Sequence, residues 1–168
     1  LRRRIVVITC VAWVPLLLLS AVGGRLLGLG ADVAVGIPFL HDIEAHVRFL
    51  VSLPILIGAE VIVHRRLRPV VQQFVERRLV GPDELPKFEQ AIQATMRWRN
   101  SVLTEVALLV AVYSLGLWIW FNQIALGAPS WYATPEAGHM QLTAAGYWYV
   151  FVSVPIFQFI FLRWYLRF

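Results

Sequence analysis

The segment from Ile5 to Gly24 contains 20 consecutive residues without a charged side chain. A spanning helix needs about 20 mostly apolar residues, because the hydrocarbon layer is about 30 Å thick and a helix rises about 1.5 Å per residue. The segment therefore predicts a membrane-spanning helix, which Pro15 is expected to bend. A cleaved signal peptide is the alternative, because Arg2 to Arg4 precede the segment and small residues, Ser20 to Gly23, end it. The length of the segment favours a retained helix.

Three further apolar segments have a similar length, and they comprise residues 47–63, 101–123 and 147–162. Hydrophobic residues make up 59% of the 168-residue chain and charged residues 15%, whereas soluble domains contain about 25% charged residues. A single cysteine excludes a disulfide scaffold, and the apolar content excludes a disordered chain. The sequence predicts an all-α, polytopic membrane protein that forms one transmembrane domain, 1–168, with four spanning helices.

The basic residues are unevenly distributed among the predicted loops. Three precede the first span, eight lie between the second and third, and two follow the fourth, whereas only Arg25 and Arg48 lie on the opposite side. Lys and Arg concentrate in the cytoplasmic loops of membrane proteins. We therefore expect both termini and residues 65–100 to lie in the cytoplasm. The net charge of +5 then reflects topology, and no nucleic-acid partner is indicated.

Residues 65–100 have an amphipathic pattern. Apolar residues recur at helical spacing from Leu67 to Leu79, Gly81 and Pro82 end that helix, and Asp83 can cap a second one. We expect a helical hairpin that lies in the layer of anionic lipid headgroups, or one that packs on its own helices or on a further domain. The residues expected to contact headgroups are Arg65, Arg66, Arg68, Arg77 and Arg78.

Two acidic residues, Glu60 and Glu105, lie within the predicted second and third spans. An ionisable group inside a span costs about 2.5–3.5 kcal/mol on insertion scales, so it usually has a partner or a functional role. We expect both carboxylates to face the bundle interior, within ion-pair reach of a basic side chain. The candidate partners are His64, Arg97 and Arg99. The structural interpretation is an ion pair between two helices, and the functional interpretation is a proton or cation pathway.

The segment from His41 to His46 contains several residues of types that bind metals. In a helix its four possible ligands divide between two faces, whereas zinc needs three or four ligands around one point. A zinc site would therefore need a residue from the other predicted outer loop. The candidate set is His41, Glu44, His46 and His139. The simpler interpretation, which we favour, is an acidic helix start in which Asp42 and Glu44 face the helix dipole and Glu44 pairs with Arg48. No cofactor is predicted.

Tryptophan and tyrosine residues gather near the ends of the predicted spans, where such side chains commonly anchor helices in the headgroup layer. We interpret them as two anchoring belts and not as a ligand-binding cage. The predicted outer belt comprises Trp118, Trp120, Trp131, Trp148, Tyr147 and Tyr149, and the inner belt comprises Trp98, Trp164 and Tyr165.

The stretch from His41 to Leu50, followed by an apolar span and a cluster of arginines, resembles a group of uncharacterised bacterial multi-pass membrane proteins. The resemblance covers the part of the chain before the third predicted span. It implies a bacterial inner membrane and a longer parent chain, and it implies no catalytic residue. The ends at Leu1 and Phe168, the latter just after an apolar run, also lead us to expect a fragment of a longer chain.

The chain lacks the sequence motifs of the nucleophile-elbow hydrolases, the phosphate-binding loop, the dinucleotide-binding fold and the zinc proteases. We therefore expect a non-enzymatic integral membrane protein that works in the lipid bilayer as a subunit of a homo-oligomer or of a complex with other membrane subunits. An ion- or proton-conducting transport component that uses Glu60, His64 and Glu105 is the first alternative. A membrane-embedded, metal-dependent enzyme is the second.

Overall fold

The computed structural model describes residues 1–28, 36–60, 62–63, 86–88, 90, 101–119, 122, 129–136 and 139–167. The described chain is mostly helical. Its first part contains α1 (Arg2–Val22), η1 (Phe39–His41), α2 (Ile43–His46), the π-helical segment η2 (Val47–Ser52) and helical residues 53–60. Its second part contains α5 (Val102–Ala111), the π-helical η3 (Val112–Gly116), α6 (Leu117–Ile119), β1 (Ala133–Glu136), β2 (His139–Leu142), α7 (Ala144–Trp148), the π-helical η5 (Tyr149–Ser153) and α8 (Val154–Arg167).

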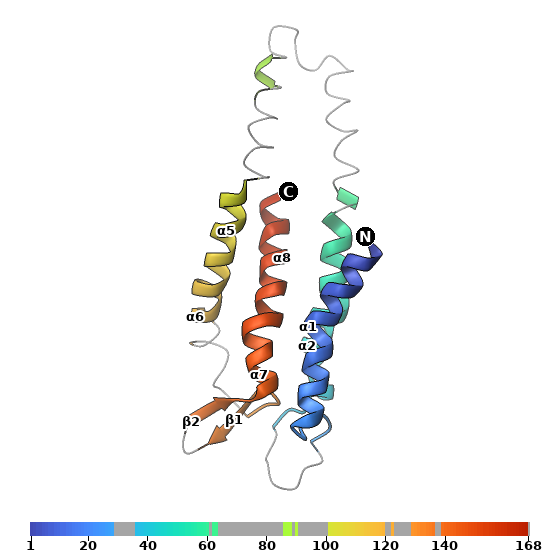
Figure 1. Ribbon diagram of the computed structural model, residues 1–168, viewed down its shortest axis with the longest axis vertical. Coiled ribbons are helices and arrows are strands. Elements are labelled where there is room, and N and C mark those ends of the chain that lie inside the picture. The colour runs from blue at the N-terminus through green and yellow to red at the C-terminus, as the bar shows by residue number, and fades with distance from the viewer. Residues whose placement is uncertain are drawn as a thin grey trace.

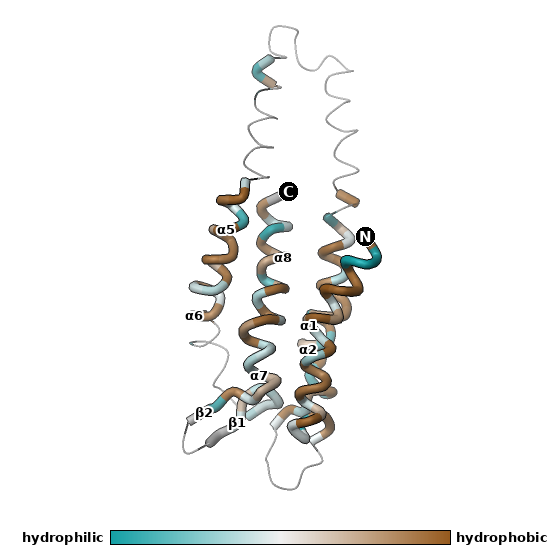
Figure 2. The backbone as a smooth tube through the Cα atoms, in the orientation of Figure 1, coloured by the Kyte–Doolittle hydropathy of each residue, from teal (hydrophilic) through white to brown (hydrophobic). Residues whose placement is uncertain are grey.

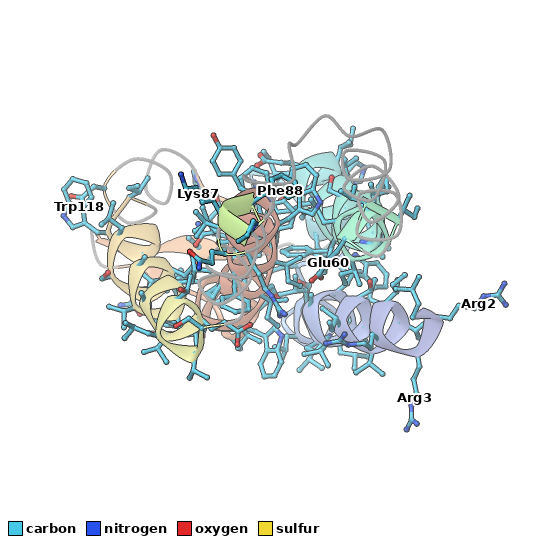
Figure 3. All side chains as sticks on the ribbon, turned by 90° about the horizontal axis from the view of Figure 1, so that it is seen from above. Arg2, Arg3, Glu60, Lys87, Phe88 and Trp118 are labelled. Carbon is cyan, nitrogen blue, oxygen red and sulfur yellow. The ribbon has the colours of Figure 1, made fainter. Side chains whose placement is uncertain are left out.

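Within the described residues, three helices are long and apolar enough to cross a membrane, and they comprise Arg2–Val22, Val102–Ile119 and Ala144–Leu166. Hydrophobic residues predominate along these helices (Figure 2). The predicted span 5–24 begins inside its helix because the polar residues Arg2 to Arg4 continue the helix beyond the apolar run, and the predicted span 147–162 lies inside Ala144–Leu166. The arginine stems extend away from the bundle, as Arg2 and Arg3 do in Figure 3, which is typical of long charged side chains near the end of a span.

The helices alternate in direction (Figure 1). The start of α1 and the end of α8 lie at one end of the bundle, together with residues 62–63 and the start of α5. We call this the terminal end. The β1–β2 hairpin lies at the opposite end, which we call the hairpin end.

The core lies between α1, residues 43–60 and the α7–α8 stretch. Its fully buried members include Ala12, Leu16, Phe49, Leu53 and Val150. The helix that begins with α5 packs mainly against α8, on the side of α8 that lies away from α1 (Figures 1 and 3). The bundle is therefore a three-helix core with a fourth helix attached to one member.

The first helix is an integral part of this core. Ala12, Leu16 and Ser20 form its buried face, and the Ser153 hydroxyl donates a 2.7 Å hydrogen bond to the carbonyl oxygen of Ala12. Pro15 lies inside the helix. The helix ends where Gly24 adopts a positive φ of 68°, a conformation that glycine accepts without a steric penalty.

A two-stranded antiparallel hairpin precedes α7, and the sequence did not predict it. Its pairs run from Ala133 opposite Leu142 to Glu136 opposite His139. Each strand has four residues, and β1 contains Pro135, so neither strand gives the alternating pattern from which strands are predicted. The predicted helical class is thus correct for most of the described chain and incomplete at the hairpin.

The predicted outer belt is wrong for two of its members. Trp131 is 0% exposed and Tyr149 is 6% exposed, so both belong to the core. Trp118, at 62% exposed, and Tyr147 do lie on the outer surface, and Figure 3 shows Trp118 pointing away from the bundle. The side chains of Trp98 and Trp120 lie outside the described residues.

Gly146 provides a test of how the hairpin docks on the bundle. A Cβ at Gly146 would clash with the backbone oxygen of Tyr132, whereas one at Gly58 would meet nothing within 4 Å. We expect Gly146→Ala to destabilise the fold by about 1–3 kcal/mol, the usual cost of overpacking. Gly58→Ala, the matched control, should leave the stability unchanged or raise it by up to about 1 kcal/mol, because alanine favours helix. Thermal unfolding in detergent measures both, and equal melting temperatures would contradict the close docking.

Candidate functional site

Polar and aromatic side chains from distant parts of the chain meet near the hairpin end. We call this group the hairpin-end cluster, and its members are Trp13, Phe39, Asp42, Glu44, His46, Arg48, Trp131 and Tyr149. Three of the members are fully or almost fully buried: Phe39, Trp131 and Tyr149. The cluster is the largest group of interacting polar side chains in the described residues, so we consider it first as a possible site.

Asp42 connects the start of α2 to the segment before the hairpin. Its Oδ1 accepts a 3.0 Å hydrogen bond from the backbone nitrogen of Ala45, which caps the helix. Its Oδ2 accepts a 2.8 Å bond from the indole nitrogen of Trp131. The backbone nitrogen of Trp131 in turn donates to the carbonyl oxygen of Ile37 at 3.0 Å. One oxygen of Asp42 thus caps its own helix, and the other joins that helix to the segment before the hairpin.

His46 joins α2 to α1. Its Nδ1 accepts a 3.1 Å hydrogen bond from the indole nitrogen of Trp13. An imidazole nitrogen that accepts carries no proton, so this contact requires the neutral tautomer with its proton on Nε2. The ring also makes an edge contact with Phe39, with 5.0 Å between centroids. The contact with Trp13 occupies one of the two nitrogens that could bind a metal.

Arg48 joins η2 to the last helix. Its guanidinium forms an ion pair with Glu44, which confirms the predicted pair. It also donates a 2.8 Å hydrogen bond to the hydroxyl of Tyr149 and lies 5.8 Å from the ring centroid of Phe157. A partly buried charge is costly unless it has such partners, and the ring face adds a favourable cation–π contact.

The π-helical segments supply part of this geometry. Arg48 lies in η2 and Tyr149 begins η5, so their hydrogen bond joins two π-helical segments. A third segment, η3, contributes Tyr113, whose hydroxyl donates a 3.1 Å bond to the carbonyl oxygen of Phe151 in η5. A π turn changes the regular pairing of backbone groups and is frequent at functional positions. Pro155, four residues after Phe151, has no backbone N–H, so the Phe151 carbonyl can accept from a side chain of another helix.

The predicted metal-binding set is not brought together in the described part of the chain. No three His, Cys, Asp or Glu residues there are close enough to hold an ion. Glu44 pairs with Arg48, and His46 accepts from Trp13. His41 is exposed on η1, and the side chain of His139 lies outside the described residues. The geometry fits the simpler interpretation of residues 41–48 as a capped, acidic helix start.

Near the terminal end, Glu105 has a partner that sequence analysis did not name. Its Oε1 lies 3.4 Å from Nη2 of Arg163 in α8. The predicted fourth span ended at residue 162, so Arg163 was assigned to the chain beyond it. Helix α8 continues beyond residue 162, so Arg163 lies within it and faces Glu105 near the start of α5. The contact links α5 to α8, which is the structural role expected of such a pair.

Glu60 lies at the terminal end of helical residues 53–60, and its side chain points toward the middle of the bundle (Figure 3). Its expected partners lie outside the described residues, as do the arginines expected to contact lipid headgroups. Those residues are His64, Arg97, Arg99, Arg65, Arg66, Arg68, Arg77 and Arg78. The structure therefore does not bring Glu60 and Glu105 into one described site.

Comparisons of the chain with protein families, with curated proteins and with solved structures found no match. The functional argument therefore depends on the geometry of the chain itself.

The two contacts of Asp42 predict the effect of a small substitution. Asp42→Asn keeps one acceptor oxygen and replaces the other with an NH₂ group, which would face a donor from Ala45 or Trp131. We expect a loss of about 0.5–2 kcal/mol of stability, the range for a side-chain hydrogen bond in a membrane protein. His41→Gln, next to it on the exposed surface, is the control and should change the stability little. Unfolding in mixed detergent micelles measures the difference, and equal stabilities would contradict the role of Asp42.

Proposed function

We propose that the chain is a non-enzymatic, four-span protein of a bacterial inner membrane and that it acts as a subunit of a larger membrane assembly. In chain order, residues 47–63 are the second of the four proposed spans, and they are added to the three helices that are long enough to cross a membrane. The support is that helical residues 43–60 run antiparallel to α1 and pack against it, as a spanning neighbour would (Figure 1). The core contacts of α1 support a first span that is retained in the working protein.

The proposed orientation puts the terminal end in the cytoplasm. The start of α1, residues 62–63, the start of α5 and the end of α8 all lie at this end (Figure 1). Thirteen of the 15 basic residues belong to the segments that begin, end or connect there, and such residues favour the cytoplasmic side. Residues 65–100 connect two helices that meet this end, so we place their amphipathic hairpin at the cytoplasmic surface, in contact with anionic headgroups.

The absence of an enzymatic role is inferred from how the polar residues are used. In the hairpin-end cluster, Asp42, His46 and Arg48 each contact a residue from another part of the chain. These contacts stabilise the bundle, and they use both oxygens of Asp42, one nitrogen of His46 and two of the N–H groups of Arg48. An ion pathway has less support, because Glu105 of α5 forms an ion pair with Arg163 of α8.

The position of α5 carries the proposal that the chain is a subunit. This helix packs mainly against α8 and leaves a broad apolar surface uncovered. One exposed stripe contains small residues between larger ones at helical spacing, namely Leu103, Ala107, Val110 and Ser114. Helices in membranes associate through small residues that allow close approach. We therefore assign this stripe to the contact with a second copy or with another membrane subunit.

The test enlarges the small residues of the stripe. In lipid nanodiscs, wild type should have the mass of an oligomer or of a complex with a partner chain. Ala107→Leu combined with Ser114→Leu should give a monomer, because overpacking an interface costs about 1–3 kcal/mol, or up to about a hundredfold in affinity. Val102→Leu, on the exposed surface of the same helix away from this stripe, is the control and should leave the mass unchanged. A monomeric wild type that lacks any partner would contradict the proposal.

A further inference from the structure

An open groove with a volume of about 330 Å³ lies between η2 and α8. Its lining residues are Glu44, Val47, Arg48, Ser52 and Phe157. The groove has a charged end, formed by Glu44 and Arg48, and a mainly apolar remainder. Its volume is at the lower limit for ligand pockets, which range over about 300–1,000 Å³. A ligand that fits it would therefore extend beyond the groove or be small.

The charged end retains capacity for further hydrogen bonds. The guanidinium of Arg48 has five N–H donors, and its described contacts use one for Tyr149 and one for Glu44. The side chain of Glu44 is 76% exposed and that of Arg48 is 25% exposed. A carboxylate accepts up to about four hydrogen bonds. Both groups can thus contact a ligand without giving up their mutual ion pair.

The groove lies at a depth that suits a lipid headgroup. Arg48 is about 8 Å along the helix from Ile43, at 1.5 Å per residue, and therefore lies just inside the hairpin end. Beyond it the same helix exposes Val51 and Ile55, which follow Val47 of the groove at intervals of four residues. These side chains form an apolar track that leads from the charged end toward the middle of the membrane.

We propose that this groove binds one phospholipid with a zwitterionic headgroup of the phosphoethanolamine type. The phosphate contacts Arg48, the primary ammonium contacts Glu44, and one acyl chain follows Phe157 and the apolar track. The lining carries one cation and one anion, so its net charge is zero and its two charges match those of the headgroup. An anionic headgroup without an ammonium group would satisfy Arg48 and meet repulsion from Glu44. The part of the lipid that exceeds the groove lies in the surrounding bilayer.

The proposal requires only that the chain lies in a membrane, so it can fail independently of the subunit role. The test is native mass spectrometry of the delipidated chain with phosphatidylethanolamine and phosphatidylglycerol that have identical acyl chains. Wild type should bind the ethanolamine lipid about threefold to fivefold more tightly, the effect of one partly exposed ion pair. Glu44→Gln should abolish or reverse this preference, because the groove then carries a net positive charge.

Two further variants make the result specific. Glu105→Gln makes the same change of net charge in α5, which does not line the groove, and should keep the wild-type preference. Ser52→Leu narrows the groove without changing its charge and should weaken binding of both lipids, while circular dichroism shows that the helices are retained. Equal binding of the two lipids by wild type would overturn the proposal. So would identical behaviour of Glu44→Gln and Glu105→Gln.

Discussion

A polar group that is removed from water when helices pack needs a partner within the protein. Arg48 is the point at which this constraint shapes the bundle. Its partners are Glu44 on its own helix, the hydroxyl of Tyr149 and the ring of Phe157. Two of the three lie on the final helical stretch, so satisfying the guanidinium also fixes that stretch against residues 43–60.

The same requirement explains why the hairpin end is closed by side chains from four segments. Asp42 accepts from Trp131, His46 accepts from Trp13, and Ser153 donates to α1. In the described residues, the helix that begins with α5 is joined to the last helical stretch by the bond from Tyr113 to Phe151 and by the ion pair with Arg163. It lies on the side of that stretch away from α1, so it stands beside the core formed by the other helices.

Sequence alone predicted the features that depend on local composition. Apolar length predicted the three helices that are long enough to cross a membrane, and the spacing of Glu44 and Arg48 predicted their ion pair. Contacts between distant segments were not predictable in this way. Trp131 was assigned to the surface because tryptophan is common at membrane interfaces, yet a bond to Asp42, 89 residues away, accompanies its burial. Glu105 was given partners close in sequence, whereas the structure pairs it with Arg163 on another helix.

We propose that the terminal end faces the cytoplasm and the hairpin end faces outward, as the distribution of the basic residues indicates. Cysteine labelling in intact cells tests it most directly, in a background where Cys10 is replaced by serine. The cysteine at the hairpin end needs an exposed position. Gln141 on β2 is exposed, whereas Ala133 on β1 is buried, so we choose Gln141. A membrane-impermeant maleimide should label Gln141→Cys in intact cells and should label Gln73→Cys only after the cells are opened. Labelling of Gln73→Cys in intact cells, with Gln141→Cys protected, would contradict the account.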